Sequence, residues 1–430
     1  MDKTIDSFLD NEYKNYAEEV SFKRALPSAI DGMKPVRRKI FYYMSKNKNS
    51  GFIKVSAIAG GIAEKCNYHH GDASQAIINM AKDFPSSNNY SMLLPKGMFG
   101  SKLLPGSSAA SRYIHAKYNS INDLIFLDND LIEPNHDLES PEPEFYLPII
   151  PIHLINGMNG IGIGYAVKIF SRKLSDIVTS ILECIDNVDI TNAAPYFNKC
   201  NYNIQQLTMK SFEISGKYHI EKDKLVVTEL IPGMDRNKFV EHLIKLQDKN
   251  IIKTYNDESK LDFKFVIKLS DNLTHDKILQ VFNLTKVFHE NYTMLDHLNN
   301  IITFDSYNEI IKYFTDYRLK IYTKRKSLAI KKLNEEIEKI EAIIIFIKNM
   351  KDIINAKSID EIKILFKDKL KPESIEYCLK RPLSNFMKMN IDDLNNNIKE
   401  HQNMIQYYSS VEEKTLYKND LNTLLKAMNE

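Results

Sequence analysis

Residues 35–45 read P-V-R-R-K-I-F-Y-Y-M-S, and residues 54–66 read K-V-S-A-I-A-G-G-I-A-E-K-C. Apolar and small side chains recur at helical spacing in both stretches, and Pro35 stands where the first turn of a helix accepts proline. Residues 72–83 have the same spacing, after a separating N-Y-H-H-G segment. Short helices in succession on a basic segment are compatible with a helix-turn-helix fold.

The segments around these predicted helices have a different character. Residues 1–20 form a polar, amphipathic stretch that predicts an N-terminal helical arm. Gly and Pro cluster over residues 95–106, which predicts a loop that leads directly into residues 107–118.

Residues 205–290 change to strand-like runs, of which FEISGKYHI, KLVVTELI and DFKFVIKL are the clearest. Between the second and third runs, residues 236–247 have the spacing of an amphipathic helix. This alternation predicts an α/β module.

The C-terminal third carries two heptad stripes. They consist of Leu333, Ile337, Ile340, Ile344 and Ile347, and of Ile391, Leu394, Ile398, His401, Ile405 and Tyr408. The simplest arrangement is an antiparallel coiled-coil arm with a small globular tip at about residues 355–390. An ordinary helical bundle is the alternative.

The composition bounds the protein class. The chain has 430 residues, of which 43% are hydrophobic and 27% charged, as expected for a globular protein of two to four domains. We see no apolar stretch of the roughly 20 residues that span a bilayer, and no secretory signal. The four scattered cysteines form no CxxC pair, so we expect reduced thiols in the cytoplasm rather than a zinc site.

Charge is distributed unevenly along a chain whose formal net charge is +2. Residues 21–65 contain ten Lys and Arg but only two acids, and residues 96–120 contain four basic residues and no acid. Residues 121–150 contain eight acids and no Lys or Arg, which we interpret as a solvated face. The basic segments suggest a polyanion such as nucleic acid, although a solvated basic surface would have the same composition.

The stretch A-A-S-R-Y over residues 109–113 is the candidate catalytic segment. Tyr113 is one of 23 tyrosines, so it is a nucleophile only if its setting supports that role. An adjacent cation such as Arg112 favours a phenolate and stabilises the charge of a pentavalent phosphate.

The pair His69–His70, followed by Gly71 and Asp72, leaves three interpretations open. Adjacent histidines usually point apart on regular structure, which disfavours a metal site. A hydrogen bond to phosphate or general acid/base catalysis fits phosphoryl transfer better. A surface loop is the plainest alternative.

Several blocks of the sequence resemble the breakage-reunion region of type IIA DNA topoisomerases. These blocks are RALPSAIDGMKPVRRK (24–39), KVSAIAGGIAEKCNYHHGD (54–72), LLPKGMFGSKLLPGSSAASRYI (93–114), EFYLPIIPIHLINGMNGIGIGYAVKI (144–169), IIKTYNDESKLDFKFVIKL (251–269) and RPLSNFMKMNIDDL (381–394). The details are nearer to the eukaryotic and viral branch than to bacterial gyrase. The chain resembles most the medium, DNA-cleaving subunit of T-even-like bacteriophage topoisomerases.

The resemblance implies roles for individual residues. The implied catalytic residues are Tyr113 as the nucleophile, with Arg112, Arg24, His70 and Lys39. The implied DNA-binding residues are Lys34, Arg38, His69, Lys54 and Ile161, the last as a wedge that bends DNA. Over residues 72–79 the chain is about two residues shorter than the family's pattern, so no family role is assigned to residues of this segment.

The resemblance also implies an architecture, namely a multidomain, mainly helical α+β fold. It predicts an N-terminal arm (1–20), a winged-helix cleavage domain (21–150), an α/β tower (151–305) and a coiled-coil arm with a dimerisation tip (306–430). The implied function is cleavage and rejoining of double-stranded DNA by a homodimer.

The sequence lacks a phosphate-binding loop and the family's acidic metal motif, and Asp128-Asn-Asp130 is too isolated to replace that motif. We therefore expect Mg²⁺ and ATP to be bound by a large, TOPRIM-type ATPase partner subunit, with no metal site in this chain. The rival hypotheses are a non-catalytic, architectural DNA-binding protein and an inactive member of the same family.

Overall fold

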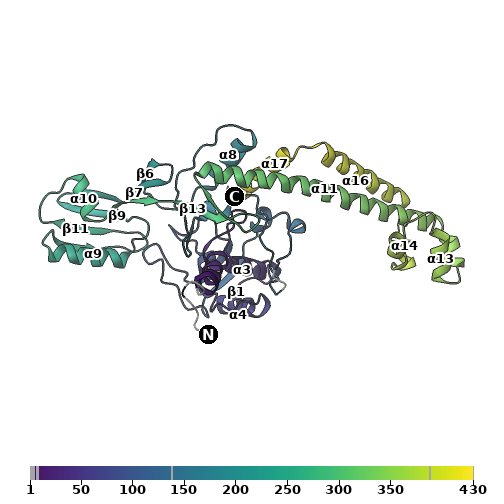
Figure 1. Cartoon of the computed structure of the whole chain (residues 1–430), viewed down its shortest axis with the longest axis horizontal. Coiled ribbons are helices and arrows are strands. Elements are labelled where there is room, and N and C mark those ends of the chain that lie inside the picture. The colour runs from purple at the N-terminus through teal and green to yellow at the C-terminus, as the bar shows by residue number, and fades with distance from the viewer. Residues whose placement is uncertain (1–4, 6–8, 137–138, 387–388, 430) are drawn as a thin grey trace. The chain divides into compact units, whose positions relative to one another are not determined.

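The computed structural model of the chain describes residue 5 and residues 9–136, 139–386 and 389–429. These residues form two compact units, namely Met1–Arg318 with Asp420–Glu430, and Leu319–Asn419 (Figure 1). The four-part division expected from the sequence is finer than this and stays a prediction.

The predicted winged helix is present. Helices α3 (Pro35–Lys46), α4 (Val55–Lys65) and α5 (Ser74–Ala81) pack on one another. Strands β1 (Ile53–Lys54), β3 (His115–Tyr118) and β2 (Leu93–Lys96) form an antiparallel sheet in the order β1-β3-β2. Pro35 is the first residue of α3, as its missing N–H and fixed φ favour.

The N-terminal arm is helical in its described part but extends beyond the predicted end. It comprises the π-helical turn η1 (Leu9–Tyr13), α2 (Lys14–Val20) and a second π-helical turn, η2 (Ser21–Ala25). Residues 1–4 and 6–8 lie outside the described residues. Arg24 therefore belongs to the helical arm and not to the loop that follows.

A four-stranded sheet in the order β14-β13-β5-β4 follows the winged helix. Its elements and the short helices around it are α6 (Asn122–Ile125), η3 (Asn129–Leu131), α7 (Ile152–Asn156), β4 (Met158–Ile161), β5 (Ala166–Ile169), α8 (Leu174–Ile185), β13 (Asn291–Leu295) and β14 (Ile301–Phe304).

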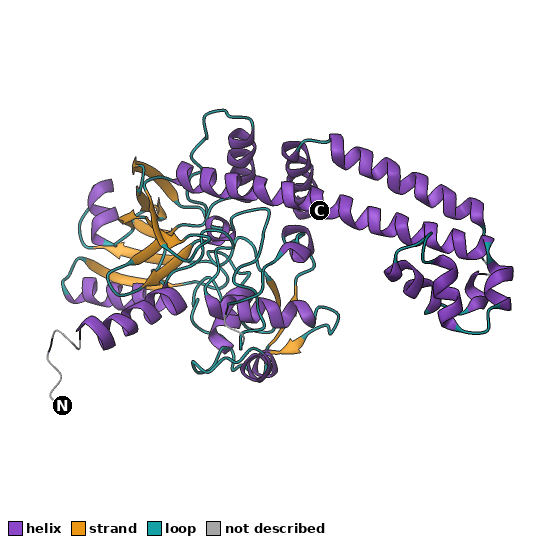
Figure 2. Ribbon diagram, turned by 45° about the vertical axis from the view of Figure 1, so that its right-hand side comes forward, coloured by secondary structure: helices purple, strands orange, loops and turns teal. Residues whose placement is uncertain are grey.

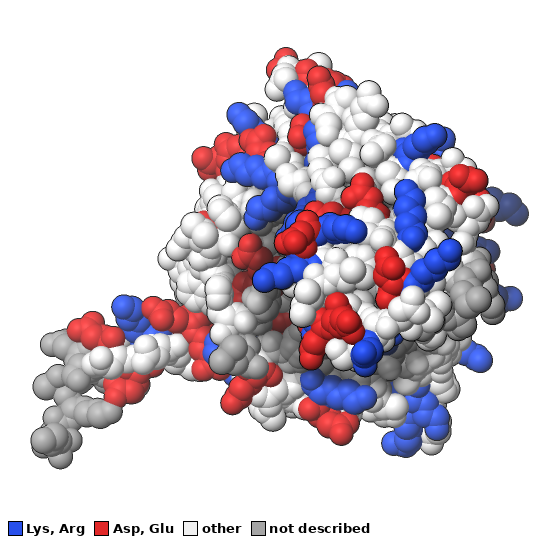
Figure 3. All heavy atoms as spheres, turned by 90° about the vertical axis from the view of Figure 1, so that its right-hand side faces the viewer, with Lys and Arg blue, Asp and Glu red and all other residues white. Residues whose placement is uncertain are grey.

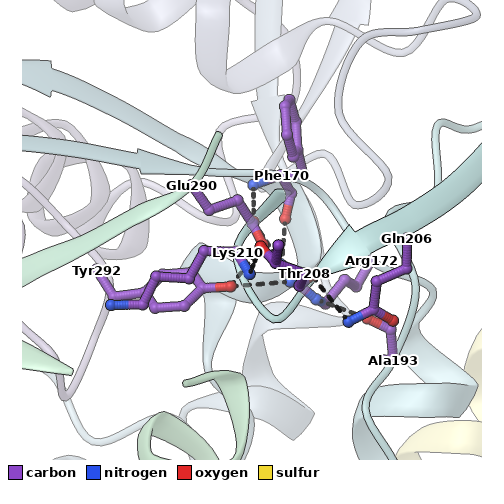
Figure 4. A network of polar contacts seen from close by, with 8 residues as sticks. All are labelled: Phe170, Arg172, Ala193, Gln206, Thr208, Lys210, Glu290 and Tyr292. Atoms are coloured by element: carbon purple, nitrogen blue, oxygen red, sulfur yellow. Dashed lines mark hydrogen bonds and ion pairs between the residues drawn. The ribbon is translucent and has the colours of Figure 1, made fainter. Parts of the chain in front are cut away.

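A buried ion pair links the ends of β5 and β13. Arg172 lies just after β5 and donates to both oxygens of Glu290, at 3.0 and 2.7 Å, while Tyr292 also donates to Glu290 (Figure 4). The Arg172 guanidinium also lies 4.8 Å from the ring of Tyr307, the first residue of α11. Since a buried charge is tolerated only when it is paired, this network specifies how the sheet meets the long helix.

The predicted α/β module contains two further sheets, in the orders β10-β11-β9-β8 and β12-β7-β6. Its elements are β6 (Asn203–Thr208), β7 (Ser211–Ser215), β8 (Lys217–Glu221), β9 (Lys224–Glu229), α9 (Arg236–Asp248), β10 (Ile252–Asp257), β11 (Phe265–Leu269), α10 (His275–Val281) and β12 (Thr285–His289). Helices α9 and α10 cover the four-stranded sheet with an apolar core. From here on we use the name tower for residues 203–289, which lie within the longer range predicted for it (151–305).

The second unit is the predicted coiled-coil arm. Helix α11 (Tyr307–Lys348) and helix α16 (Ile391–Ser410) lie side by side in both ribbon views, and α17 (Glu413–Asn429) follows (Figures 1 and 2). Glu336 of α11 pairs with His401 of α16, and Lys326 with the carbonyl of Val411, so residue numbers rise along one helix as they fall along the other. The two helices are therefore antiparallel.

The tip of the arm has a core of its own. It is built by α12 (Met350–Asn355), α13 (Ile359–Phe366), α14 (Pro372–Leu379) and α15 (Leu383–Phe386). Phe346, Phe366 and Phe386 stack in its centre. Across the described parts of both units, no helix has the length and hydropathy needed to cross a membrane.

Candidate DNA-cleavage site

Tyr113 lies in a tight turn that is fastened to the start of α4. Its side chain is 67% exposed, and its N–H donates to the carbonyl of Ala110 at 2.9 Å. On either side of Tyr113, the N–H of Ser56 donates to Ser111 at 3.2 Å and the N–H of Val55 to Ile114 at 3.0 Å. Backbone hydrogen bonds therefore hold the turn, while most of Tyr113 is exposed to solvent.

The guanidinium of Arg112 lies against the ring of Tyr113. Its guanidinium carbon lies 4.9 Å from the centre of the Tyr113 ring, within the range of a cation–π interaction. The Arg112 side chain is exposed, so its N–H groups can reach an oxyanion close to the hydroxyl.

The sheet of β1, β3 and β2, which we call the wing sheet, carries a row of basic side chains next to this turn. Residue pairing across the strands places Lys54 opposite His115, and His115 opposite Lys96. Directly paired residues share a face of the sheet, and Lys117, two residues after His115, shares it too. The opposite face is buried, through Ala116 and Tyr118.

Of this row, only Lys54 was predicted to bind DNA from the sequence. The signal for the others was present in His115–Tyr118, where polar and buried side chains alternate with the period of a half-buried strand. What the sequence could not supply was the register that aligns this strand with Lys54 and Lys96.

Arg24 and His70 form a second group. An Arg24 guanidinium nitrogen lies 3.2 Å from His70 Nδ1 and 3.3 Å from a Glu19 carboxylate oxygen. His69 instead contacts the side chain of Asn67. His70, the preferred histidine of the prediction, is thus the one that meets Arg24. Among the described residues, no hydrogen bond joins this pair to Arg112 or Tyr113.

Lys34 and Ile161 lie beside Arg24. The Lys34 ammonium donates to the carbonyl of Asn159 at 2.9 Å, and burial together with the charge of Arg37 lowers the pKa of Lys34. A Cβ at Gly160 would lie 2.2 Å from the Ala25 carbonyl oxygen, so the β4–β5 hairpin can pack here only with glycine. Ile161, at the end of β4, is 82% exposed.

Arg38 and Lys39, for which the family resemblance implies DNA-binding and catalytic roles, contact other residues of the chain. Those roles stay predictions. Arg38 is buried, and its guanidinium donates to Asp31 at 2.8 Å and to the Met33 carbonyl at 3.0 Å. Lys39 donates to the Cys66 carbonyl at 2.7 Å and pairs with Glu142 at 2.8 Å. These contacts tie both side chains to neighbouring segments of the chain.

The prediction that the acids of residues 121–150 form a solvated face is wrong for two of them. Glu142 is buried against Lys39, and Asp128 is buried in an ion pair with Arg318 of α11. These acids are neutralised by basic residues distant in sequence, which local composition does not reveal.

The side chains around Tyr113 do not fit a magnesium site. Mg²⁺ prefers carboxylate oxygens in octahedral geometry, whereas Arg112, Lys54 and Lys96 are cations. Across the described residues, no group of three or more His, Cys, Asp or Glu side chains is arranged to hold a metal ion.

Charge on the molecular surface is mixed on the face seen in Figure 3, where acidic and basic side chains alternate without a large patch of one sign.

Comparisons with known proteins agree with this geometry. The chain is 29% identical to the mitochondrial DNA topoisomerase 2 of Dictyostelium discoideum, over 98% of this chain and 35% of that protein. It is 31% identical to the DNA topoisomerase 2 of Meyerozyma guilliermondii, over 85% of this chain and 26% of that protein. The chain therefore spans about a third or less of the length of these relatives.

A solved structure shows the same fold. The DNA-binding, cleavage and re-ligation domain of Plasmodium falciparum topoisomerase II superposes with a TM-score of 0.89 at 27% identity, over 98% of this chain and 64% of that one. The family model for the A-type subunits of DNA gyrase/topoisomerase IV matches residues 24–424. The chain belongs to this family, the A-type subunits of DNA gyrase/topoisomerase IV.

Proposed function

We propose that this chain is the DNA-cleaving and rejoining subunit of an ATP-dependent type II DNA topoisomerase, with Tyr113 as its nucleophile. The observation that carries the proposal is the exposure of Tyr113, which lies on a turn hydrogen-bonded to the start of α4, with the Arg112 guanidinium 4.9 Å from its ring. A tyrosine that only packed in a core would not be presented in this way.

The proposed reaction exchanges one phosphodiester for another. The Tyr113 oxygen forms a bond to phosphorus, the bond from phosphorus to the 3′ oxygen breaks, and a proton is transferred overall from the phenol to that oxygen. The products are a 5′-phosphotyrosyl link and a free 3′-hydroxyl. Because the number of ester bonds is unchanged, the same groups can reseal the break.

Each group of cations has a role in this proposal. Arg112 stabilises the charge of the pentavalent phosphate, and Arg24 with His70 holds a neighbouring part of the backbone. Lys54 and Lys34 contact phosphates. Ile161 inserts between base pairs and bends the duplex, as an exposed apolar side chain beside cations can do.

Arg38 and Lys39, which the family resemblance placed near the phosphate, are better supported as residues that hold the site together. Arg38 orders the turn before α3 through Asp31, and Lys39 joins α3 to the end of α4 and to Glu142.

Two copies of the chain, one per strand, would make a double-strand break through which a second duplex passes, allowing relaxation and decatenation. In this proposal the tip of the coiled-coil arm forms the dimer contact. The basic donor set at Tyr113 supports the idea that Mg²⁺ is held mainly by a TOPRIM-type partner subunit, which would also use ATP. We further propose that the protein is a phage-type medium subunit that works in a host cytoplasm.

The test is a covalent trap. The chain is mixed with its TOPRIM-type ATPase subunit, Mg²⁺ and labelled supercoiled DNA, and the reaction is stopped with denaturant. We expect a protein–DNA adduct on this chain with the wild type, and a loss of at least about 1,000-fold with Tyr113→Phe, which lacks the attacking oxygen.

Equal adduct formation by wild type and Tyr113→Phe would refute the proposed nucleophile. No adduct with either, together with tight DNA binding, would favour an architectural protein or an inactive family member. A monomer at micromolar concentration in gel filtration would contradict the two-strand scheme.

A further inference from the structure

The loop that leads from β2 to Tyr113 closes on itself. The N–H of Ala109 donates to the Met98 carbonyl at 2.9 Å, and at the loop tip the N–H of Ser101 donates to Leu104 at 3.2 Å. Gly100 has a φ of +117°, and a Cβ there would lie 2.9 Å from the Pro105 carbonyl oxygen. We call residues 97–109 the active-site loop, since only three residues separate it from Tyr113.

The tip of this loop is inserted into the tower. Leu103 is buried in an apolar core whose other fully buried members lie between Leu225 and Leu284. The N–H of Arg236, the first residue of α9, donates to the Leu103 carbonyl at 3.0 Å. The loop therefore reaches across to a separate part of the unit.

Lys102 adds a charged anchor beside Leu103. Only 8% of the residue is exposed, and its ammonium donates to Glu229 at 2.8 Å and to Asp262 at 3.0 Å, 5.6 Å from the ring of Phe263. Burial alone would lower the pKa of Lys102, but the hydrogen bonds to the two carboxylates outweigh it and raise the pKa. A buried lysine with two carboxylate partners is specific in position, because any other placement would leave a charge unpaired.

We propose that Lys102 is a positioning residue for DNA cleavage, which fixes the turn of Tyr113 by docking the active-site loop onto the tower. The inference rests on the proposed function of Tyr113. It makes the tower part of the catalytic apparatus, since a displacement of the Glu229 carboxylate would be transmitted through the closed loop to the nucleophile.

The test compares Lys102→Met with Lys260→Met, which removes an exposed lysine of the same tower. We measure hydrogen exchange at the amides of Ala109 and Tyr113, DNA affinity, and the rate of adduct formation. For Lys102→Met we expect exchange about 10-fold faster, DNA affinity within about 2-fold of wild type, and adduct formation slower by on the order of 100-fold. Lys260→Met should match wild type in all three.

A reciprocal pair tests the contact itself. Lys102→Glu should be as impaired as Lys102→Met, and adding Glu229→Lys should restore most of the adduct rate. If Lys102→Met is too unstable to assay, Asp262→Asn keeps the Glu229 pair and should give a smaller effect in the same direction.

Wild-type exchange and wild-type adduct formation in Lys102→Met would overturn the inference, as would a loss of DNA affinity equal to the loss of cleavage. Failure of the wild-type chain to form any adduct would instead refute the proposed function, and the exchange experiment would still show whether Lys102 holds the loop.

Discussion

Two sets of cations in the winged-helix region look alike in sequence and differ in structure. Arg38 and Lys39 are held inside by Asp31 and Glu142, whereas Arg112 and Lys54 are exposed on the side of Tyr113. The basic segments therefore contain both ion-paired cations inside the fold and exposed cations. Cations buried against carboxylates, such as Arg38 with Asp31, stabilise the fold, whereas exposed cations are accessible to a polyanion.

The largest expected effect is on protein stability, through the buried ion pair of Arg38 and Asp31. Arg38→Met leaves the fully buried carboxylate of Asp31 without its cation, so the free energy of unfolding should fall by about 3–5 kcal/mol. Urea denaturation measures this. If the variant keeps its stability and loses DNA affinity instead, Arg38 contacts DNA, as the family resemblance implied.

Arg112→Ala should show the opposite behaviour. Since the side chain is exposed, its loss should change the free energy of unfolding by less than about 0.5 kcal/mol. Adduct formation should fall by about 100- to 1,000-fold, because a charge that stabilises the pentavalent phosphate is gone. Arg112→Lys, which keeps a cation, should recover part of the rate; no difference between the two variants would argue against a charge effect.

His153 extends the comparison to a buried group that lacks a hydrogen-bond partner on either ring nitrogen among the described residues. Burial, with a further contribution from the charge of Arg172, lowers the pKa of His153 to about 3. The imidazole of His153 is therefore protonated below about pH 6.5 in the unfolded chain, but it stays neutral in the folded chain until the pH approaches 3. Above about pH 6.5 the buried, neutral His153 does not reduce the free energy of unfolding. As the pH falls from 6.5 toward 3, the free energy of unfolding decreases, because the unfolded chain binds a proton there that the folded chain does not bind.

Between pH 7 and pH 5 this effect should cost about 2 kcal/mol in the free energy of unfolding. His153→Leu should flatten the pH dependence over this range, while His136→Leu, at an exposed position, should leave it unchanged. An unchanged slope in His153→Leu would show that other groups cause the acid sensitivity.

The smallest expected effect is on DNA affinity, through Lys54 in the row of basic side chains on the wing sheet. Lys54→Ala should weaken DNA binding a few-fold and reduce the slope of log affinity against log salt by about 0.9, the value for one lost phosphate contact. Protein stability should not change. Lys48→Ala is the matched control, because Lys48 is also exposed but already pairs with Asp123; an equal loss in both variants would point to non-specific attraction.

The sequence alone determined the elements and the candidate nucleophile. Helices over 35–46, 55–65 and 74–81 follow from local periodicity and from Pro35, and the two long helices of the arm follow from their heptads. Tyr113 and Arg112 were identified by family resemblance, and their catalytic roles stay a prediction. Periodicity and neighbouring residues are local properties, which a sequence displays directly.

Which charged side chains are exposed to a ligand depends on contacts between segments that are far apart in the sequence. The partner of Lys39 is Glu142, that of Asp128 is Arg318, and that of Lys102 is Glu229, all far away along the chain. Burial and ion pairing arise between segments that folding brings together. The composition therefore gives the number of cations, but it does not show which of them are buried and paired. For the same physical reason, the docking of the active-site loop on the tower was invisible in the motif that contains it.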